Sequence, residues 1–307
     1  MYRKCIILIA LWFSIPILFF AQKKKTIQKE KLETKSKLVL EVPDSIKDGS
    51  YKYYFPNSQK VQKEENFIKG KRHGESWTYY ENDEVHEFIS YTNGMKQGIY
   101  KLYFPNGQKQ ISGRYFANKE DGEWTYYYDN GKVYLIKNYK LGVDEGSMTM
   151  FTKEGILMAD GFYKEGKKHG KWIDFHDNGN KRLEAYYKHG KYEGPYSSYW
   201  DNGKIQNQSY FLNGELEGQI MDYDSMGNPI SRYSYRNGRK SGAFETFYIH
   251  GKVKENGMYR SNVLDGKYKF FYDNGLVKEE GEYKEGKKIG KWFIYDANGK
   301  KTKEIFD

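Results

Sequence analysis

The chain has 307 residues, a formal net charge of +10, and 30% charged against 38% hydrophobic residues. Its single cysteine excludes an internal disulfide framework, a cysteine-ligated zinc site and a haem attachment motif. The 32 glycines recur at a regular interval, which favours a repeat array over an enzyme built around a buried pocket.

Residues 1–21 have the pattern of a secretory signal. Basic Arg3 and Lys4 precede the apolar run 6–20, which ends before Ala21. The run is shorter than the about 20 residues that a membrane span needs. We therefore expect an exported protein, whether periplasmic, envelope-associated or secreted, with cleavage after Ala21. An uncleaved N-terminal anchor is the alternative.

Residues 22–47 are charged and poor in apolar side chains, which predicts a flexible tether. Within it, the segment Leu38–Val42 is expected to add a strand that caps the start of the following domain.

Residues 48–307 repeat with a period of 24 residues, without insertion or deletion after the first copy. The recurring glycines are Gly74, Gly98, Gly122, Gly146, Gly170, Gly194, Gly218, Gly242, Gly266 and Gly290. The first copy starts at Gly49 and has one extra residue. A fixed period in this range is typical of a repeat array, here of about eleven units. We number each unit from this glycine as position 0.

Two positions are aromatic throughout. Position 5 holds Tyr54, Tyr79, Tyr103, Tyr127, Phe151, Phe175, Tyr199, Tyr223, Phe247, Phe271 and Tyr295. Position 17 holds Phe67, Tyr91, Tyr115, Tyr139, Tyr163, Tyr187, Phe211, Tyr235, Tyr259 and Tyr283. Because one aromatic per unit at a fixed phase is most simply core, both sets are predicted to be buried, and Tyr127→Ala is predicted to cost about 3–5 kcal/mol. Position 2 is often large as well, as at Trp124.

Each unit also contains two turn signals. Positions 8 and 9 read Asn-Gly in six units, as at Asn106-Gly107, which predicts a type I′ turn. A second turn falls near position 20, where Asn118 and Asn262 replace glycine and are expected to take positive φ. After residue 50, no segment has apolar residues at the intervals of three and four that are typical of a helix. The sequence therefore predicts an all-β fold, an elongated antiparallel β-hairpin array.

The motif G-x-W-x-x-Y-x-x-N-G, seen in 122–132 and closely matched in 170–179, resembles the bacterial variant of the MORN repeat, as found in the YwqK-type antitoxin family. The resemblance covers about residues 48–307. It implies a β array without catalytic residues that binds another protein, with an antitoxin or immunity-like role and a toxin as partner. The segments Gly146–Phe151 and Ser225–Asn228 depart from the motif and are expected to be irregular without breaking the array.

No constellation of residues indicates catalysis, a cofactor or a metal. His73, His169 and His189 lie in loop-like surroundings at long separations, and no H-x-x-x-H spacing occurs. We therefore expect a protein that is not an enzyme and has no cofactor or metal, while its partner-binding residues and oligomeric state stay open.

Surface candidates come from residues that do not follow the repeat phase. Trp200, Tyr186, Tyr210 and Tyr233 are interpreted in this way as candidates for an exposed ligand surface. Lysine-rich loops such as 164–168 suit either solvated turns or a basic stripe for an acidic partner. Our leading hypothesis is an exported protein that binds another protein. The alternative is a cell-envelope module that binds glycan or anionic lipid. Nucleic acid is a poor candidate because export separates the chain from it.

Overall fold

The computed structural model describes residues 46–306, and the residues from Lys47 onward belong to one compact unit. The predicted signal 1–21 and nearly all of the predicted tether 22–47, with its capping strand Leu38–Val42, lie outside the described residues. Every regular element in residues 46–306 is a strand, and this part of the chain has no helix long and apolar enough to cross a membrane.

The strands are β1 (Gly49–Tyr54), β2 (Val61–Ile68), β3 (Lys71–Arg72), β4 (Gly74–Tyr79), β5 (Val85–Thr92), β6 (Met95–Tyr103), β7 (Lys109–Phe116), β8 (Lys119–Glu120), β9 (Gly122–Tyr127), β10 (Val133–Lys140), β11 (Val143–Phe151), β12 (Leu157–Lys164), β13 (Lys167–Phe175), β14 (Lys181–Lys188), β15 (Lys191–Tyr199), β16 (Ile205–Leu212), β17 (Glu215–Leu216), β18 (Gly218–Tyr223), β19 (Pro229–Arg236), β20 (Arg239–Phe247), β21 (Val253–Arg260), β22 (Val263–Leu264), β23 (Gly266–Phe271), β24 (Val277–Lys284), β25 (Lys287–Tyr295) and β26 (Lys301–Phe306).

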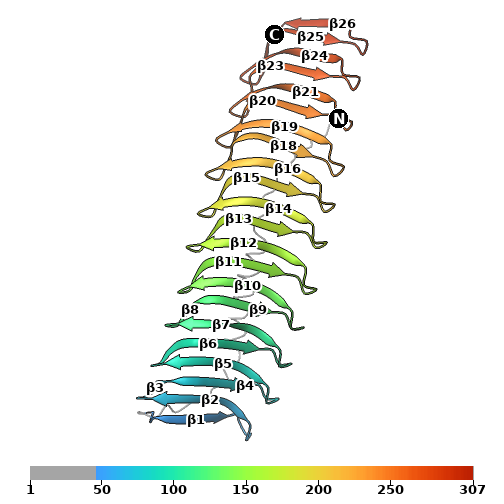
Figure 1. Cartoon of the computed structure of the whole chain (residues 1–307). Helices are drawn as coiled ribbons and strands as arrows, with labels where there is room; N and C mark the ends of the chain where they lie inside the picture. The colour runs from blue at the N-terminus through green and yellow to red at the C-terminus, as the bar shows by residue number, and fades with distance from the viewer. Residues whose placement is uncertain (1–45, 307) are drawn as a thin grey trace. The chain divides into compact units, whose positions relative to one another are not determined.

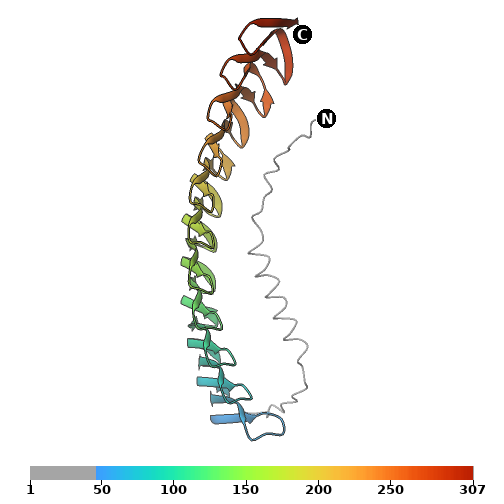
Figure 2. The same ribbon diagram turned by 90° about the vertical axis from the view of Figure 1, so that its right-hand side faces the viewer.

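The strands form one open antiparallel sheet in chain order. Each longer strand pairs with the next longer strand, from β1 with β2 to β25 with β26, and Figures 1 and 2 show the hairpins following one another along the sheet. The two-residue strands β3, β8, β17 and β22 each precede a longer strand that pairs with the same neighbour. The predicted hairpin array is confirmed. The departing segments do not interrupt it, because Gly146–Phe151 lies in β11, which pairs on both sides, and Ser225–Asn228 forms the turn before β19.

The turn at positions 6 to 10 differs from the prediction. Gly107 has φ of +79°, whereas Asn106 is not among the residues with positive φ, so a type I′ turn is excluded. The Gly107 N–H donates to the Phe104 oxygen at 2.9 Å, and the Phe104 N–H donates to the Gln108 oxygen at 2.8 Å. This is a type I turn followed by a glycine bulge. The prediction failed because Asn-Gly suits both turns, and only the loop length separates them.

The second turn, at positions 19 and 20, is the type I′ turn. Both central residues have positive φ in each unit, including Leu141 at +51° beside Gly142 at +83°. Asn118 and Asn262 have φ of +67° and +72°, which confirms the expectation for these two residues.

The two faces of the sheet differ in burial. Side chains at positions 2, 4, 13, 15 and 17 share one face, which we call the aromatic face, and those at positions 1, 3, 5, 14 and 16 share the other, the opposite face. Position 2 forms the core, with Trp124, Trp172 and Trp292 buried. Position 17 is mostly half-buried and packs against it. Position 5 is not core: Tyr127 is half-buried and Tyr54 is exposed, because an odd separation from position 2 puts this residue on the opposite face.

Each buried tryptophan lies on a glycine of the preceding unit. A Cβ on Gly113, Gly161 or Gly281, all at position 15, would lie 2.3 Å from the indole Cδ2 atom of Trp124, Trp172 or Trp292, respectively. The indole N–H groups of these tryptophans donate to backbone oxygens of the preceding strand, as from Trp172 to Phe162 at 3.0 Å. The glycine therefore allows the ring to lie flat on the neighbouring backbone.

In six units, the side chain at position 6 donates a hydrogen bond to the backbone of the next unit. Tyr128 Oη donates to the Phe151 backbone oxygen at 2.9 Å, 23 residues later. The same contact is made by Tyr80 to Tyr103, His176 to Tyr199, Trp200 to Tyr223, Tyr248 to Phe271 and Tyr272 to Tyr295. Trp200 thus shares its position with four tyrosines and serves the scaffold. The prediction that it lies outside the repeat phase is wrong.

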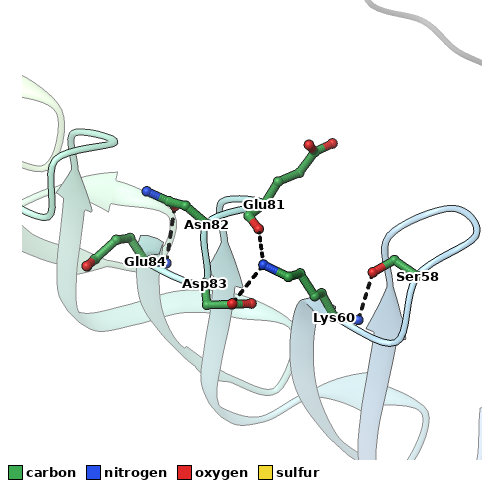
Figure 3. Close-up of polar contacts among 6 residues, drawn as sticks. All are labelled: Ser58, Lys60, Glu81, Asn82, Asp83 and Glu84. Atoms are coloured by element: carbon green, nitrogen blue, oxygen red, sulfur yellow. Dashed lines mark hydrogen bonds and ion pairs between the residues drawn. The ribbon is translucent and has the colours of Figure 1, made fainter.

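The asparagine at position 8 makes a second contact between units. Asn130 Oδ1 accepts from the Lys132 N–H within its own turn, and Asn130 Nδ2 donates to the Lys153 oxygen of the next unit, each at 3.1 Å. Lysines add to these contacts. In Figure 3, Lys60 Nζ donates to the Glu81 backbone oxygen at 2.7 Å and pairs with Asp83 at 2.8 Å, which joins the first two turns.

Removing one position-6 hydroxyl should weaken the junction that it spans. We expect Tyr128→Phe to lower the free energy of unfolding by about 1 kcal/mol, because the Phe151 oxygen loses its side-chain donor. Tyr103→Phe, at position 5, is the matched control and should change stability by less than about 0.5 kcal/mol. Urea unfolding followed by circular dichroism measures both. Equal losses in the two variants would show that the hydroxyl contact is not what matters.

Candidate binding surface

The structure assigns different roles to the four aromatic residues selected from the sequence. Trp200 belongs to the position-6 contacts, and Tyr233 lies on the aromatic face, stacked on Phe244 at 5.5 Å between ring centroids. Tyr186 and Tyr210 are exposed on the opposite face. They are in phase after all, because both occupy position 16, which Phe162 holds in the preceding unit. The signal that sequence reasoning missed was this shared position.

We call Phe162, Tyr186 and Tyr210 the aromatic row. Their side chains are 43%, 37% and 46% exposed and lie on β12, β14 and β16, with one strand between each pair. Two strand spacings place successive rings about 10 Å apart along the sheet. Lys171 lies directly across from Tyr186, and Pro195 lies across from Tyr210. The row is therefore a series of exposed rings at the pitch of the repeat.

Beyond the row, the same face is hollowed. A shallow pocket of about 320 Å³ is lined by Gln219, Arg232, Ala243, Phe244, Glu245, Asn256, Gly257, Met258 and Lys267. Arg232 pairs with Glu245 at 3.2 Å, which holds two planar polar groups at its wall. Position 16 continues from the row through Ser234 to Met258, so the row and the pocket share one line along the sheet.

The first four units carry an apolar margin beside their second turns. It consists of six side chains, each 43–52% exposed: Ile68, Met95, Ile99, Phe116, Leu141 and Val143. Lysines alternate with them, because Lys71, Lys119 and Lys140 lie directly across the turns from Ile68, Phe116 and Val143. This margin combines apolar area with positive charge.

The lysine-rich turns further along the chain have mixed charge. Lys164 lies opposite Lys167, and Lys188 lies opposite Lys191, although like charges in direct opposition are unfavourable. Carboxylates interleave with them and cap the turns, since Glu145 accepts from the Glu165 N–H at 2.7 Å and Glu193 from the Asn213 N–H at 2.6 Å. This edge therefore resembles a solvated surface more than a uniform basic stripe.

The histidines are distributed along the turn edges. His169 and His189, which are distant in sequence, come from adjoining units and have ring centroids 5.8 Å apart. The Nδ1 atoms of His73 and His169 are buried without a hydrogen-bond partner. In residues 46–306, no group of three or more His, Cys, Asp or Glu side chains is arranged to hold a metal ion.

The pKa shifts follow the packing of the aromatic face. Burial raises the pKa of Tyr115 and of Tyr196 to about 12, so both hydroxyls stay neutral. Burial lowers the pKa of Lys168 and of Lys240. Lys168 Nζ lies 3.9 Å from the centroid of the Trp172 ring, and Lys240 Nζ lies 3.5 Å from the centroid of the Tyr233 ring. Cation–π attraction therefore offsets part of the lost hydration. These groups stabilise the scaffold.

Comparison with solved structures found likenesses of low TM-score. They include the TcdB2-TccC3 crystal structure (9% identity, TM-score 0.20, 77% of this chain and 16% of that chain) and TcdB2-TccC3-Cdc42 (8%, 0.20, 81% and 16%). A Photorhabdus luminescens Tc holotoxin pore gives 9% identity and a TM-score of 0.18 over 77% of this chain and 15% of that chain. The chain thus spans about a sixth of their length. Likeness at this level says nothing about function.

Comparison with protein families gives a direct match. The MORN repeat variant matches residues 96–118, 120–141, 168–189, 192–213 and 264–285. A search of curated proteins found no match. The five matched segments lie in phase within one hairpin array, so the chain contains MORN-type repeats.

Proposed function

We propose that this chain is an exported, non-enzymatic scaffold that binds another protein through its apolar margin. The margin is the observation that carries the proposal, since a group of exposed large apolar side chains with charged residues beside them is typical of a protein interaction site. The pattern of residues 1–21 supports export. The scaffold roles of the tyrosines, the turn asparagines and the capping carboxylates support a function without catalysis.

The chemistry of the margin favours an acidic protein partner. Apolar side chains exclude water at the centre of an interface, and charged groups around them select a complementary surface. Lys71, Lys119 and Lys140 supply positive charge, while the carboxylate of Asp121 is engaged as an acceptor from the Leu141 N–H at 3.3 Å. The resemblance to YwqK-type antitoxins supports a toxin as this partner, and export supports one that acts in the periplasm or at the cell surface.

Binding to a candidate toxin, sought among the proteins encoded beside this gene, tests the proposal. We expect the double variant Met95→Ser/Phe116→Ser to bind it at least tenfold more weakly than the wild type and to lose protection in co-expression. Leu276→Ser, an exposed leucine at a distant turn, is the matched control and should bind normally. Normal binding by the double variant would exclude the margin, and failure of the wild type to bind or protect would remove the antitoxin role.

The alternative is an envelope module for glycan or anionic lipid, and its glycan form is favoured by a different observation, the aromatic row.

A further inference from the structure

We propose that the aromatic row and the adjoining pocket form one site for an uncharged linear polysaccharide. The site lies on the opposite face of β12 to β23 and shares no residue with the apolar margin. It is independent of the protein partner proposed above.

The rings supply the stacking part of the site. Phe162, Tyr186 and Tyr210 are exposed on a sheet that needs none of them for its core. An aromatic ring offers a flat apolar face with a polar edge, which suits the C–H face of a pyranose ring surrounded by hydroxyls. Rings about 10 Å apart along the sheet match an extended polymer that presents the same face once per two sugars.

The charges between the rings argue against an anionic polymer. Position 14 supplies Asp160 and Glu184 beside the row. Glu184 is paired with Lys171 at 2.9 Å and with Lys181 at 2.7 Å, whereas Asp160 has only a hydrogen bond from Thr149 at 3.0 Å. The two carboxylates and the two lysines cancel, so the floor of the row is neutral. It offers phosphate, sulfate and uronate groups no net attraction, whereas hydroxyl and acetamido groups need none.

The pocket supplies directional hydrogen bonds at one end of the row. Gln219, Arg232, Glu245 and Asn256 carry planar groups with paired donors or acceptors, which suit vicinal sugar hydroxyls. Met258, which is 43% exposed on the same face, supplies apolar surface beside them. The hollow lies where Ala243 contributes only a methyl group to this face, and few polar groups placed in an apolar recess are typical of a small-molecule site.

Titration calorimetry with hexasaccharides of β-1,4-linked glucose and β-1,4-linked N-acetylglucosamine tests the site. We expect the wild-type protein to bind at least one of them and the trisaccharide more weakly. Tyr186→Ala/Tyr210→Ala and Arg232→Gln should each reduce affinity at least tenfold. Phe116→Ala, which removes an equally exposed ring elsewhere, should bind like the wild type.

Further controls test the fold of the variants, the independence of the two sites and binding to anionic ligands. Circular dichroism should show that the variants keep their fold, since all three side chains lie at least partly in water. The margin variant Met95→Ser/Phe116→Ser should retain polysaccharide binding even if it loses its protein partner. The inference is overturned if neither hexasaccharide binds, if binding survives loss of both tyrosines, or if the protein instead binds polygalacturonate or phosphatidylglycerol vesicles in a salt-sensitive manner.

Discussion

Replacing Gly161 with alanine is expected to lower the free energy of unfolding by about 3 kcal/mol, the upper part of the usual range for overpacked cores. The new Cβ would lie 2.3 Å from Trp172 Cδ2, closer than two carbon atoms can approach. The ring has little room to move, because its indole N–H is bound to the Phe162 oxygen and Tyr163 packs against it edge-on at 5.1 Å.

The next unit shows how the clash could be relieved. Ala185 occupies the same position as Gly161 and is 0% exposed, and the ring that follows it is Tyr196 instead of a tryptophan. The double variant Gly161→Ala/Trp172→Tyr recreates this pair. We expect it to be more stable than the sum of the two single changes predicts, with a coupling of at least about 1 kcal/mol.

Urea unfolding followed by far-ultraviolet circular dichroism measures the four members of this cycle. Ala185→Gly serves as the control for backbone effects and should cost only about 1 kcal/mol. Additive losses within about 0.5 kcal/mol would show that the glycine and the indole do not constrain each other. Amide exchange near β12 and β13 should rise first, because stability in a repeat array depends on contacts between neighbours.

The repeat period determined how much of this molecule could be predicted. The spacing of the glycines and the second turn, including Asn118 and Asn262, were readable because each depends on residues close in sequence. The turn at Asn106 was assigned to the wrong type, since the same dipeptide fits both loops. Contacts such as Tyr128 to Phe151 join positions 6 and 5 of different units, and no pattern within one unit displays them.

The candidate surface was only partly readable for a related reason. Sequence spacing alone places Tyr186 and Tyr210 outside the repeat phase. Their exposure in fact follows from position 16 of the repeat, which both of them occupy. Comparing position 16 across all units would have added Phe162 and separated Trp200 and Tyr233 from the set. The pocket could not be predicted, because it is lined by residues of several strands around the small side chain of Ala243.

Trp124→Ala is expected to be among the most damaging single substitutions, costing about 3–5 kcal/mol, whereas Tyr127→Ala should cost only about 1–2 kcal/mol. Both residues lie in β9, three positions apart. Trp124 is buried between Tyr100 and Tyr115, whose ring centroids lie 5.4 Å and 5.1 Å from it, and its removal leaves a cavity that these rings cannot fill. Tyr127 is half-buried on the opposite face, and its hydroxyl has one long contact, 3.4 Å to Ser112.

Comparing Trp124→Ala with Tyr127→Ala shows which aromatic position stabilises the array, because both variants replace a ring with alanine in the same strand. Urea unfolding should therefore show that Trp124→Ala loses more free energy of unfolding than Tyr127→Ala by a factor of about two or more. Tyr127→Phe should match the wild type within about 0.5 kcal/mol. If Tyr127→Ala instead proved as damaging as Trp124→Ala, the core would have to extend to both faces of the sheet. The side chains of the opposite face would then be needed for stability, and the rings at position 16 would be less available to bind a ligand.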